Sequence, residues 1–504
     1  MPIARLLIAN RGEIAVRVAA TAREMGIETV AVFSELDREA FHVRQADRAV
    51  SIGSGPPGQT YLSIERLLSA ARAAGADAVH PGYGFLSENP AFARAVLEAG
   101  LTWVGPDPES IEAMGDKLEA RKRAAAAGVR VVPGTCAVAA AGPSAGRDGL
   151  LAEEARRIGY PLLVKASAGG GGQGMSRVDR PEALPEAIAQ ARRVAGASFG
   201  DETVYLEKLL DRPRHVEFQV FGDRAGNVVH LFERECSVQR RHQKIVEETP
   251  SAALDTRLRA AMGKAAVLAA RAARYVGAGT VEFLLDASGK FYFLEMNTRL
   301  QVEHPITEET LGLDLVRAQI EVAGGAKLPK AWCDGTLSPR GHSIEMRLYA
   351  EDPEDFLPRA GSLLAYGQPR GPGIRVDSGV AAGSVVGLDF DPLLAKLVVC
   401  AGSRTAAIER ARRALLEWVV LGVETNMPLL SAVLGSEEFA SGSYDTGLVD
   451  RLPSRRDASV PDAAWVAAAL AIERPDPGGS VQRQDRAPGV LDPWTDAAGW
   501  RSLS

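Results

Sequence analysis

The sequence predicts an α/β protein, α+β over its whole length, built from about three domains. Its 504 residues exceed what one hydrophobic core usually organises. Through residues 1–115, short apolar runs alternate with segments of helical spacing, a pattern typical of a parallel sheet covered by helices. Two later stretches, 116–330 and 331–450, mix further strands and helices with glycine-rich breaks. The tail, 451–504, is rich in Pro, Arg, Asp and Ser.

The spacing of apolar residues predicts the elements of the first domain. Short apolar runs predict strands at 5–9, 28–33 and 77–79. Apolar residues three to four positions apart predict helices at 12–25, 61–74 and 89–99. Strands that alternate with helices predict a parallel sheet, and a further helix at 115–127 is expected to end at Gly128.

The same signals predict the later elements. Residues 135–149 are small and have no period, so we expect a surface loop or hinge there. Strands are expected at 161–166, 203–208 and 341–349, as a pair within 214–236 around a turn at 222–227, and as a hairpin at 279–296 around 286–289. Helices are expected at 181–194, 405–417 and 463–472, and at 255–275 with Asp255 as its cap.

Composition and charge exclude several classes of function. The net charge is −6, from 58 Lys and Arg against 64 Asp and Glu, which argues against a nucleic-acid coat or a polybasic membrane binder. No apolar run approaches the ~18 residues of a membrane span, and the first residues lack the long apolar stretch of a signal peptide. The four cysteines stand far apart without a CxxC pair, so we expect a reducing cytoplasm and no structural zinc.

A glycine run follows one of the predicted strands. Lys165 ends the strand, and residues 169–172 are four consecutive glycines, whose backbone N–H groups can close on phosphate oxygens without side-chain obstruction. The ammonium of Lys165 would meet a phosphate there. The run lacks the GK[ST] of a P-loop and the GxGxxG of a dinucleotide site, and a flexible linker is the other interpretation.

Two carboxylates and an amide mark the predicted hairpin. With a turn of two residues, Glu282 would lie opposite Phe293 or Glu295. Either register places Glu282, Glu295 and Asn297 on one face, because side chains alternate along a strand. These oxygen ligands suit Mg²⁺ or Mn²⁺ that bridges nucleotide phosphates, whereas two solvated strand carboxylates are the alternative.

Two further segments carry side chains that bind anions. After Asn297 come Arg299, Gln301 and Glu303, a set that can bind a small oxyanion and remove its proton; a polar loop cap is the alternative. Residues 239–244 gather donor side chains, which predicts either a phosphate clamp or a solvated charged loop.

Two other features have weaker implications. Cys236 has no neighbour that marks a nucleophile, so we interpret it as structural. Residues 80–89 form a glycine-rich turn in which Ser87 is expected to cap the next helix. The turn follows a predicted parallel strand, where open α/β sheets bind ligands.

Taken in order, these segments closely resemble the biotin carboxylase family of ATP-grasp enzymes. The resemblance runs from Ile3 to Leu448 and rests on IANRGEIAVR, HPGYGFLSEN, MGDK, LLVKASAGGGGQGM, ERECSVQRRHQK, GTVEFL, FLEMNTRLQVEHP and RLYAEDP. It implies an N-terminal Rossmann-like domain at 1–115, an ATP-grasp domain at 116–330 with a mobile lid at about 135–205, and a C-terminal carboxylase domain at 331–450.

The resemblance implies a ligase reaction in two steps. ATP phosphorylates bicarbonate to carboxyphosphate, and the carboxylate then passes to N1′ of biotin on a carrier. ATP and Mg²⁺ or Mn²⁺, expected as two ions, are the implied cofactors, and biotin is a carrier-bound substrate not attached to this chain. This is the first half-reaction of a biotin-dependent carboxylase, here expected to be an acyl-CoA carboxylase of fatty acid metabolism.

Motif by motif, the resemblance implies a full set of contacts. The implied nucleotide contacts are Lys117, Lys165, Gly171, Gly172, Glu207, Lys208, Leu209, Leu210, His215, Gln239, His242 and Glu282. The implied metal ligands are Glu282, Glu295 and Asn297. The implied bicarbonate contacts are Lys244, Arg299, Gln301 and Val302, with Glu303 as the base. The implied biotin contacts are Tyr83 and Arg347, the latter as the group that stabilises the biotin enolate.

The chain departs from the family's pattern at two positions. Gln173 stands in the glycine loop where Lys or Arg is usual, and Phe390 replaces a commoner tyrosine. None of the eight methionines is followed by Lys, so we expect biotin on another chain or on a part absent from this sequence. The tail is similar to segments that follow the carboxylase domain in acyl-CoA carboxylase α-subunits, and would be the start of a connecting domain.

Partners and alternatives complete the expectations. The implied partners are a biotin carboxyl carrier in trans, a second copy of the chain and a carboxyltransferase subunit, with no nucleic acid and no membrane. A carbamoyl-phosphate synthetase type of ligase is the first alternative, which Arg347 disfavours. A weakly catalytic nucleotide-binding subunit is the second, favoured only by Gln173. A dehydrogenase is excluded because no GxGxxG follows the first strand. The final carboxyl acceptor stays open.

Overall fold

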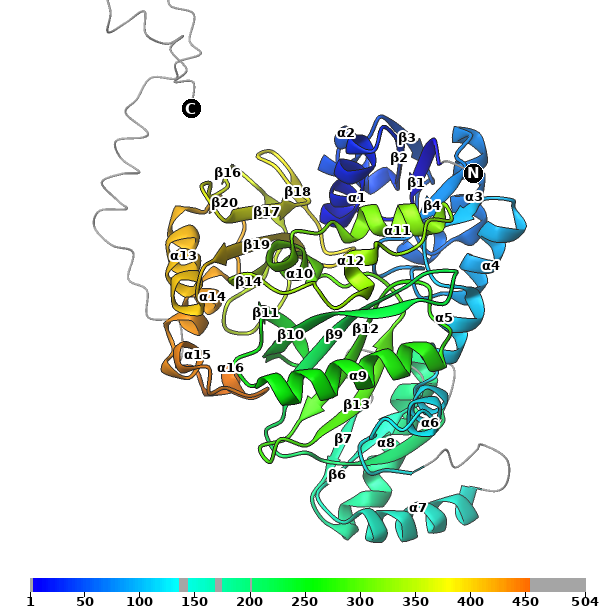
Figure 1. Cartoon of the computed structure of the whole chain (residues 1–504), viewed down its shortest axis with the longest axis vertical. Helices are drawn as coiled ribbons and strands as arrows, with labels where there is room; N and C mark the ends of the chain where they lie inside the picture. The colour runs from blue at the N-terminus through cyan, green and yellow to red at the C-terminus, as the bar shows by residue number, and fades with distance from the viewer. Residues whose placement is uncertain (1–2, 136–143, 168–174, 200–201, 454–504) are drawn as a thin grey trace, which may run out of the picture. The chain divides into compact units, whose positions relative to one another are not determined.

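The computed structural model of the chain describes residues 3–135, 144–167, 175–199 and 202–453 (Figure 1). The helix expected at 463–472 lies outside this part of the chain. Among the described residues, no helix combines the length and the apolar character that a membrane crossing requires.

The N-terminal part folds as the predicted parallel sheet. Its strand order is β3-β2-β1-β4-β5, and every neighbouring pair is parallel. The strands are β1 (Arg5–Ile8), β2 (Glu28–Phe33), β3 (Arg48–Ser51), β4 (Ala78–His80) and β5 (Thr102–Trp103). The helices are α1 (Gly12–Glu24), α2 (Phe41–Gln45), α3 (Ile64–Ala74), α4 (Pro90–Glu98) and α5 (Pro108–Gly115), with short 3₁₀ turns at Glu35–Asp37 and Pro57–Gln59. The edge strands β3 and β5 were not predicted, because each contains too few apolar residues to form a pattern.

The helix α4 corrects one predicted cap. Asn89, not Ser87, precedes the helix, and its side-chain oxygen accepts a hydrogen bond from the backbone N–H of Phe92 at 2.9 Å. The helix begins at Pro90, whose fixed φ suits the first helical position, so the cap must be the residue immediately before it.

The helix predicted at 115–127 is also wrong at its start. α5 ends at Gly115, and a separate helix, α6 (Lys117–Ala126), follows. Between them Asp116 is extended, and its carboxylate accepts hydrogen bonds from the N–H groups of Leu118 and Glu119 at 2.9 and 2.8 Å. A short acidic side chain that bonds to nearby N–H groups favours a cap over a helix interior, which explains the break.

A small three-stranded sheet follows, with the order β7-β6-β8. Its elements are α7 (Ser144–Ile158), β6 (Leu162–Ala166), β7 (Ser176–Val178), a 3₁₀ turn (Pro181–Ala183), α8 (Leu184–Phe199) and β8 (Val204–Lys208). The loop predicted at 135–149 is therefore wrong for its last six residues, which begin α7. Glycines lowered the helix propensity of that stretch, but the helix-favouring residues that follow extend the helix back into it.

The central feature is an eight-stranded sheet in which all neighbours are antiparallel. Its order is β13-β12-β9-β10-β11-β14-β19-β17. The strands are β9 (Arg214–Gly222), β10 (Val228–Arg240), β11 (Gln243–Thr249), β12 (Gly277–Leu285), β13 (Phe291–Asn297), β14 (His342–Tyr349), β17 (Ile374–Ser378) and β19 (Leu393–Ala401). Because β11 pairs with β14, one sheet runs through both later stretches of the chain.

Helices and short strands complete this region. The helices are α9 (Thr256–Ala272), α10 (His304–Leu311), α11 (Leu315–Ala323), α12 (Lys330–Cys333), α13 (Arg404–Glu417), α14 (Met427–Gly435), α15 (Glu437–Ser441) and α16 (Leu448–Arg451). Two small sheets pair β15 (Gly361–Ser362) with β18 (Val385–Val386) and β16 (Ala365–Gly367) with β20 (Val419–Leu421).

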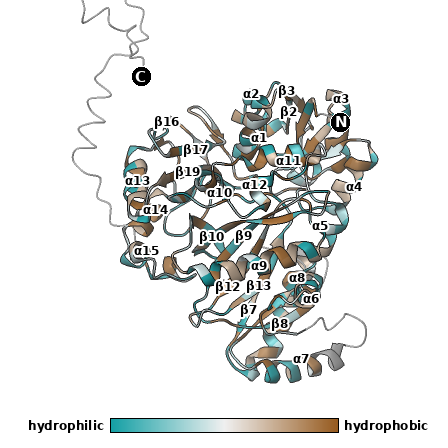
Figure 2. Cartoon of the chain, viewed as in Figure 1, coloured by the Kyte–Doolittle hydropathy of each residue, from teal (hydrophilic) through white to brown (hydrophobic). Residues whose placement is uncertain are grey.

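The helix α9 shows how the sheet is covered. Asp255 caps it as predicted, accepting a hydrogen bond from the N–H of Leu258 at 2.7 Å. Its buried residues Met262, Ala266 and Ala269 recur at helical spacing and pack over β9 and β10. Figure 2 accordingly shows both hydrophobic and hydrophilic residues along α9. The helix α9 thereby covers β9 and β10 on one face of the sheet.

Candidate active site

A cavity of about 1110 Å³ collects most of the residues that the sequence singled out. Strands from all parts of the eight-stranded sheet line it, together with β6, β8 and the loop after β4. The predicted residues on its wall are Tyr83, Lys117, Lys165, Glu207, Lys208, Leu209, Leu210, His215, Gln239, His242, Lys244, Glu282, Glu295, Asn297, Arg299, Gln301, Val302 and Arg347. Glu303 is fully buried behind this wall. Gly171, Gly172 and Gln173 lie outside the described residues.

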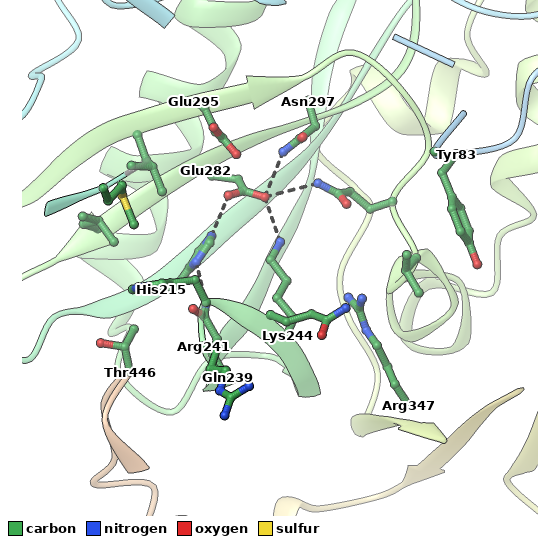
Figure 3. A pocket seen from close by; sticks show the side chains of 18 of the residues that line it. Tyr83, His215, Gln239, Arg241, Lys244, Glu282, Glu295, Asn297, Arg347 and Thr446 are labelled. Atoms are coloured by element: carbon green, nitrogen blue, oxygen red, sulfur yellow. Dashed lines mark hydrogen bonds and ion pairs between the residues drawn. The ribbon is translucent and has the colours of Figure 1, made fainter. Parts of the chain in front are cut away.

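The β12–β13 hairpin brings the predicted metal ligands together (Figure 3). Glu282 pairs directly with Glu295, and Thr280 pairs with Asn297. The observed register is therefore one of the two that the sequence allowed. Because paired residues project to the same side of a sheet, Glu282, Glu295 and Asn297 share one face.

The hairpin differs from its predicted form in two ways. Its strands are joined by residues 286–290, a longer turn than the two residues assumed. In addition, the register shifts by one residue in β13 between Phe293 and Glu295. This bulge lets Phe293 pack into the hydrophobic core while both Leu294 and Glu295 line the cavity.

Both carboxylate oxygens of Glu282 have hydrogen-bond or ion-pair partners. Its Oε1 accepts hydrogen bonds from Nζ of Lys244 at 2.8 Å, Nδ2 of Asn297 at 2.9 Å and Nε2 of Gln301 at 3.2 Å. Its Oε2 lies 2.8 Å from Nε2 of His215 (Figure 3). Burial alone would raise the pKa of the Glu282 carboxyl, but Lys244 and His215 outweigh burial and lower the pKa. Glu282 is consequently ionised.

Glu295, directly opposite, has no such support. Within the described part of the chain, no hydrogen bond or ion pair reaches its carboxylate, and no dashed line meets it in Figure 3. Burial and the neighbouring charge of Glu282 both raise the pKa of the Glu295 carboxyl. Two facing carboxylates beside the amide of Asn297 form a set of hard oxygen donors that fits Mg²⁺ or Mn²⁺. A divalent cation would neutralise the repulsion between them.

Lys244 sits at the centre of the buried carboxylates. Its Nζ donates to Glu303 at 2.7 Å and to Glu282 at 2.8 Å, and it also forms an ion pair with Glu217. Burial lowers the pKa of the ammonium, but the three carboxylates together raise that pKa well above its usual value. Lys244 is therefore a fixed positive charge on the cavity wall.

Glu303 is held between two cations. Oε1 accepts from Lys244, and Oε2 accepts from Nη2 of Arg347 at 2.8 Å. Arg347 also forms an ion pair with Glu247 at 2.6 Å. Burial would raise the pKa of Glu303, whereas Lys244 and Arg347 lower it well below its usual value. The implied base is thus ionised, and it touches the residue implied to stabilise the biotin enolate.

Arg299 is oriented by its neighbours rather than by Glu303. Its guanidinium donates to Glu88 at 2.8 Å, to Oε1 of Gln301 at 3.0 Å and to Oδ1 of Asn297 at 3.2 Å. Among the described residues no hydrogen bond joins Arg299 to Glu303. The loop that carries the implied bicarbonate contacts is therefore tied to the N-terminal part through Glu88.

A second ionic cluster lies at the other end of the cavity. The Glu207 carboxylate forms ion pairs with both Lys165 and Arg121, and all three side chains are buried. Arg121 also donates to the carbonyl oxygen of Val132 at 2.6 Å. The carboxylate of Glu207 is thus engaged by two cations.

The donor-rich stretch 239–244 places all of its residues except Arg240 on the cavity wall. It spans the end of β10 and the start of β11, where neighbouring side chains point to opposite faces. Arg240 pairs with Glu351 away from the cavity wall, whereas Gln239 contacts His215 and Lys244 reaches the carboxylates. The anion clamp therefore stays a prediction for the residues on the wall, and Arg240 is engaged elsewhere.

Cys236 lies inside the same strand. It is fully buried, and its Sγ is 3.9 Å from Oε1 of Glu303. Burial first, then the charge of Glu217, raises the pKa of the thiol well above its usual value. The residue is a buried, protonated thiol beneath the wall, in agreement with the structural interpretation.

Several charged residues of the site were not singled out from the sequence. They are Glu88, Arg121, Glu217, Arg234 and Glu247. Glu88 lies within the glycine-rich turn at 80–89, and Glu217 is two residues from His215 on β9, so it shares that residue's face. Strand periodicity gave a usable signal for Glu217. No pattern pointed to Arg121, whose partner Glu207 comes from a distant part of the chain, or to Arg234, which pairs with Glu217 across the β9–β10 hairpin.

Three protein-family models match the chain in sequence order. The model described as biotin carboxylase, N-terminal domain, matches residues 2–111. The model described as carbamoyl-phosphate synthase L chain, ATP binding domain, matches residues 116–331, and the biotin carboxylase C-terminal domain matches residues 345–451.

Curated relatives and solved structures agree with these matches. The chain is 48% identical over 457 residues to a pyruvate carboxylase subunit of Methanothermobacter thermautotrophicus, covering 90% of this chain and 91% of the relative. It is 47% identical over 451 residues to a biotin carboxylase of Halalkalibacterium halodurans, covering 88% and 97%. A Campylobacter jejuni biotin carboxylase solved as a complex with a β,γ-ATP compound superposes with a TM-score of 0.85 at 41% identity, covering 89% and 99%.

A further solved structure contains several of the expected ligands. It is the biotin carboxylase domain dimer of the Hydrogenobacter thermophilus 2-oxoglutarate carboxylase, in complex with MgADP, ADP and bicarbonate. It superposes with a TM-score of 0.87 at 42% identity, covering 91% of this chain and 100% of that one.

Proposed function

The chain belongs to the biotin carboxylase family, a family of ATP-dependent ligases, and we propose that it carboxylates biotin on a carrier protein in two steps. In the first, ATP transfers its γ-phosphoryl group to bicarbonate, giving carboxyphosphate and ADP. In the second, carboxyphosphate yields CO₂ and phosphate, and CO₂ bonds to N1′ of the biotin ring as that nitrogen loses its proton to phosphate.

The observation that carries this proposal is the placement of Glu303. Its ionised carboxylate lies between Lys244 and Arg347, next to the cavity wall that Arg299 and Gln301 also line. A carboxylate there can accept the proton of bicarbonate, and the surrounding cations can bind the dianion that results. The same cations that keep Glu303 ionised also make it a weaker base. Proton transfer to Glu303 therefore also requires that these cations stabilise the deprotonated bicarbonate.

The rest of the cavity is suited to nucleotide and metal. We assign Glu282, Glu295 and Asn297 to Mg²⁺ or Mn²⁺, expected as two ions, which would neutralise phosphate charge during transfer. We assign the adenine edge to the backbone from Glu207 to Leu210. The nucleotide's other contacts are assigned to Lys117, Lys165, His215, Gln239, His242 and the glycine loop with Gly171 and Gly172. The relative crystallised with MgADP and bicarbonate supports this ligand set.

Arg347 is the proposed biotin group. Its guanidinium is buried, charged and bonded to Glu303 and Glu247. As N1′ loses its proton, negative charge develops on the ureido oxygen, and a guanidinium beside it stabilises that charge. Tyr83 is the proposed second contact on the same cavity wall.

Assembly and organisation extend the proposal. We assign residues 1–115, 116–330 and 331–450 to the N-terminal, ATP-grasp and C-terminal domains, with a lid at about 135–205. A biotin carrier in trans, a carboxyltransferase and a second copy of the chain are the proposed partners, in the cytoplasm. The named relatives that are subunits of pyruvate and methylcrotonoyl-CoA carboxylases, and the dimeric solved domain, support these partners.

The test is ADP release from MgATP, with and without bicarbonate, free biotin and ammonia. We expect release that requires bicarbonate and rises with biotin. Release that responds to ammonia and ignores biotin would instead indicate a carbamoyl-phosphate type of ligase, the class named by the family model over 116–331.

A further inference from the structure

A buried lysine joins distant parts of the chain behind the cavity wall. Lys396 lies on β19, and its side chain is 0% exposed. Its Nζ donates a hydrogen bond to the carbonyl oxygen of Val302 at 2.8 Å. The same atom lies 3.3 Å from Oε1 of Glu13, 3.8 Å from Oδ2 of Asp377 and 6.0 Å from the ring centroid of Tyr83. One ammonium thus contacts α1, β17, the loop after β4 and the loop before α10.

Sheet register explains why Lys396 reaches this point. It pairs directly with Arg347 on β14 and with Asp377 on β17, so the three side chains share one face. On that face Arg347 bonds to the carboxylate of Glu303. Lys396, its neighbour, bonds to the peptide that immediately precedes Glu303. Two adjacent strands therefore hold the side chain and the backbone of the same residue.

The loop from 298 to 303 has no regular secondary structure and depends on such contacts. Its start is tied by the N–H of Thr298, which donates to Glu88 at 2.9 Å. Its middle is tied by the carbonyl of Gln301, which accepts from Nδ1 of His304 at 2.8 Å. Lys396 ties its end, where the proposed bicarbonate contact Val302 meets the proposed base Glu303.

Burying a lysine is costly, so its retention needs a reason beyond packing. An apolar side chain of similar length would fill the same space without desolvating a charge. Glu13 and Asp377 compensate the charge, but Glu13 is itself a buried carboxylate and the Asp377 side chain is only 10% exposed. The hydrogen bond to the Val302 carbonyl is the contact of this group that reaches the loop carrying Glu303.

We propose that Lys396 is a positioning residue, which holds the 302–303 peptide so that the Glu303 carboxylate stays between Lys244 and Arg347. The proposal deepens the proposed function, on which its kinetic consequences rest. The hydrogen bond itself does not depend on that function. Lys396 touches neither nucleotide nor metal ligands among the described contacts, so its effect should be confined to bicarbonate and biotin.

The experiment compares Lys396→Met, Glu13→Gln and the double variant of the full chain with the wild-type protein. Lys396→Met keeps the length of the side chain but removes the donor. The double variant also removes the Glu13 charge left unpaired, so it separates charge burial from the hydrogen bond. Glu13→Gln alone leaves the Lys396–Val302 hydrogen bond in place and is the matched control.

Two readouts are needed for each variant. Hydrogen–deuterium exchange of the peptide covering 300–305 reports the backbone directly and requires no activity. KM values for bicarbonate, biotin and MgATP, together with kcat and the melting temperature, report the consequences for catalysis and folding.

We expect faster exchange at 300–305 in both variants that lack Lys396, and a KM for bicarbonate raised about tenfold, as for a lost charge-assisted hydrogen bond. The KM for MgATP should stay within about twofold, and Glu13→Gln should leave the KM for bicarbonate within about threefold. The double variant should recover melting temperature without recovering the KM for bicarbonate.

Two results would overturn the proposal. Unchanged exchange at 300–305 in Lys396→Met would remove its physical basis. A double variant that recovers both stability and the KM for bicarbonate would make Lys396 a structural counter-ion only. If the wild-type protein itself fails to use bicarbonate, the proposed function fails, and the exchange measurement still decides whether Lys396 fixes this peptide.

Discussion

Two carboxylates at the proposed active site, Glu295 on the cavity wall and Glu303 behind it, have opposite surroundings. Glu303 lies between Lys244 and Arg347, which lower its pKa well below its usual value. Glu295 faces Glu282 without a cationic partner among the described residues, and burial and that neighbour raise its pKa. Glu295 lies on β13 and Glu303 in the loop before α10. Because both are glutamates, the difference between their pKa values comes from their surroundings.

The two ends of the site are therefore complete to different degrees. At the Glu303 end the protein supplies every counter-charge itself, so the base is preorganised before substrate arrives. At the Glu295 end two carboxylates face each other, and no cationic side chain bonds to Glu295 among the described residues, so we propose that a divalent cation completes the site. Substitutions at the Glu303 end should therefore lower activity at any metal concentration. Substitutions at the Glu295 end should change the metal concentration that activity requires.

The largest expected effect comes from breaking the Glu303 end. Glu303→Gln should lower bicarbonate-dependent ADP release by at least about 10²-fold, the usual contribution of a general base. MgATP should still bind, since the nucleotide contacts are elsewhere; calorimetric titration measures this. Glu112→Gln, a surface carboxylate paired with Arg94, is the matched control. Turnover close to wild type would remove Glu303 from the base role.

A smaller effect is expected when the Glu295 end is weakened. Glu295→Gln removes one charged ligand, so the Mn²⁺ concentration for half-maximal activity should rise about tenfold. The KM for bicarbonate should change little at saturating metal. Metal titration of ADP release, with Mn²⁺ binding followed by paramagnetic resonance, measures both. An unchanged metal requirement would mean that Glu295 is not a ligand, and the contrast between the two ends would lose its basis.

The smallest expected effect is on the pH dependence of folding stability, through Glu13 beside Lys396. Burial raises the pKa of Glu13 to about 7, against the opposing charge of Lys396. When the pKa of a carboxyl is higher in the folded than in the unfolded protein, its protonation stabilises the fold. This stabilisation is fully present below the unfolded pKa and is lost as the pH rises through the folded pKa. A tenfold change in a protonation equilibrium corresponds to about 1.4 kcal/mol of folding free energy.

The wild-type protein should therefore lose stability between about pH 5 and pH 8 through this group. Glu13→Gln cannot ionise, so its melting temperature should fall less than that of the wild-type protein over the same range. Thermal unfolding at several pH values tests this. If the melting temperatures of the two proteins change in parallel with pH, the pKa of Glu13 is not raised in the folded protein.

Much of the fold followed from the sequence because its signals are local. The alternation of apolar runs and helical spacing predicted the parallel sheet, and Asp255 predicted the start of α9. The errors arose where one local preference competed with another: Asp116 broke a helix, and glycines concealed the start of α7. Neither competition is visible in apolar periodicity.

For the site as well, local patterns were predicted and long-range contacts were not. Period-2 alternation placed Glu282, Glu295 and Asn297 on one face, and the register confirms it. What the sequence did not predict is contact over distance. Lys244 reaching Glu217, Arg347 reaching Glu303 and Lys396 reaching Val302 all depend on how strands from separate stretches join in one sheet. The roles of these residues remain predictions.

The most direct test of the account follows the oxygen atoms of bicarbonate. With ¹⁸O-labelled bicarbonate, MgATP and biotin, proton removal and attack on ATP form carboxyphosphate, whose bridging oxygen derives from bicarbonate. Its cleavage leaves that oxygen on phosphate. Mass spectrometry should therefore find one ¹⁸O in each phosphate released. Phosphate that is free of label, released at the same rate, would show that ATP is hydrolysed by water and would contradict the account.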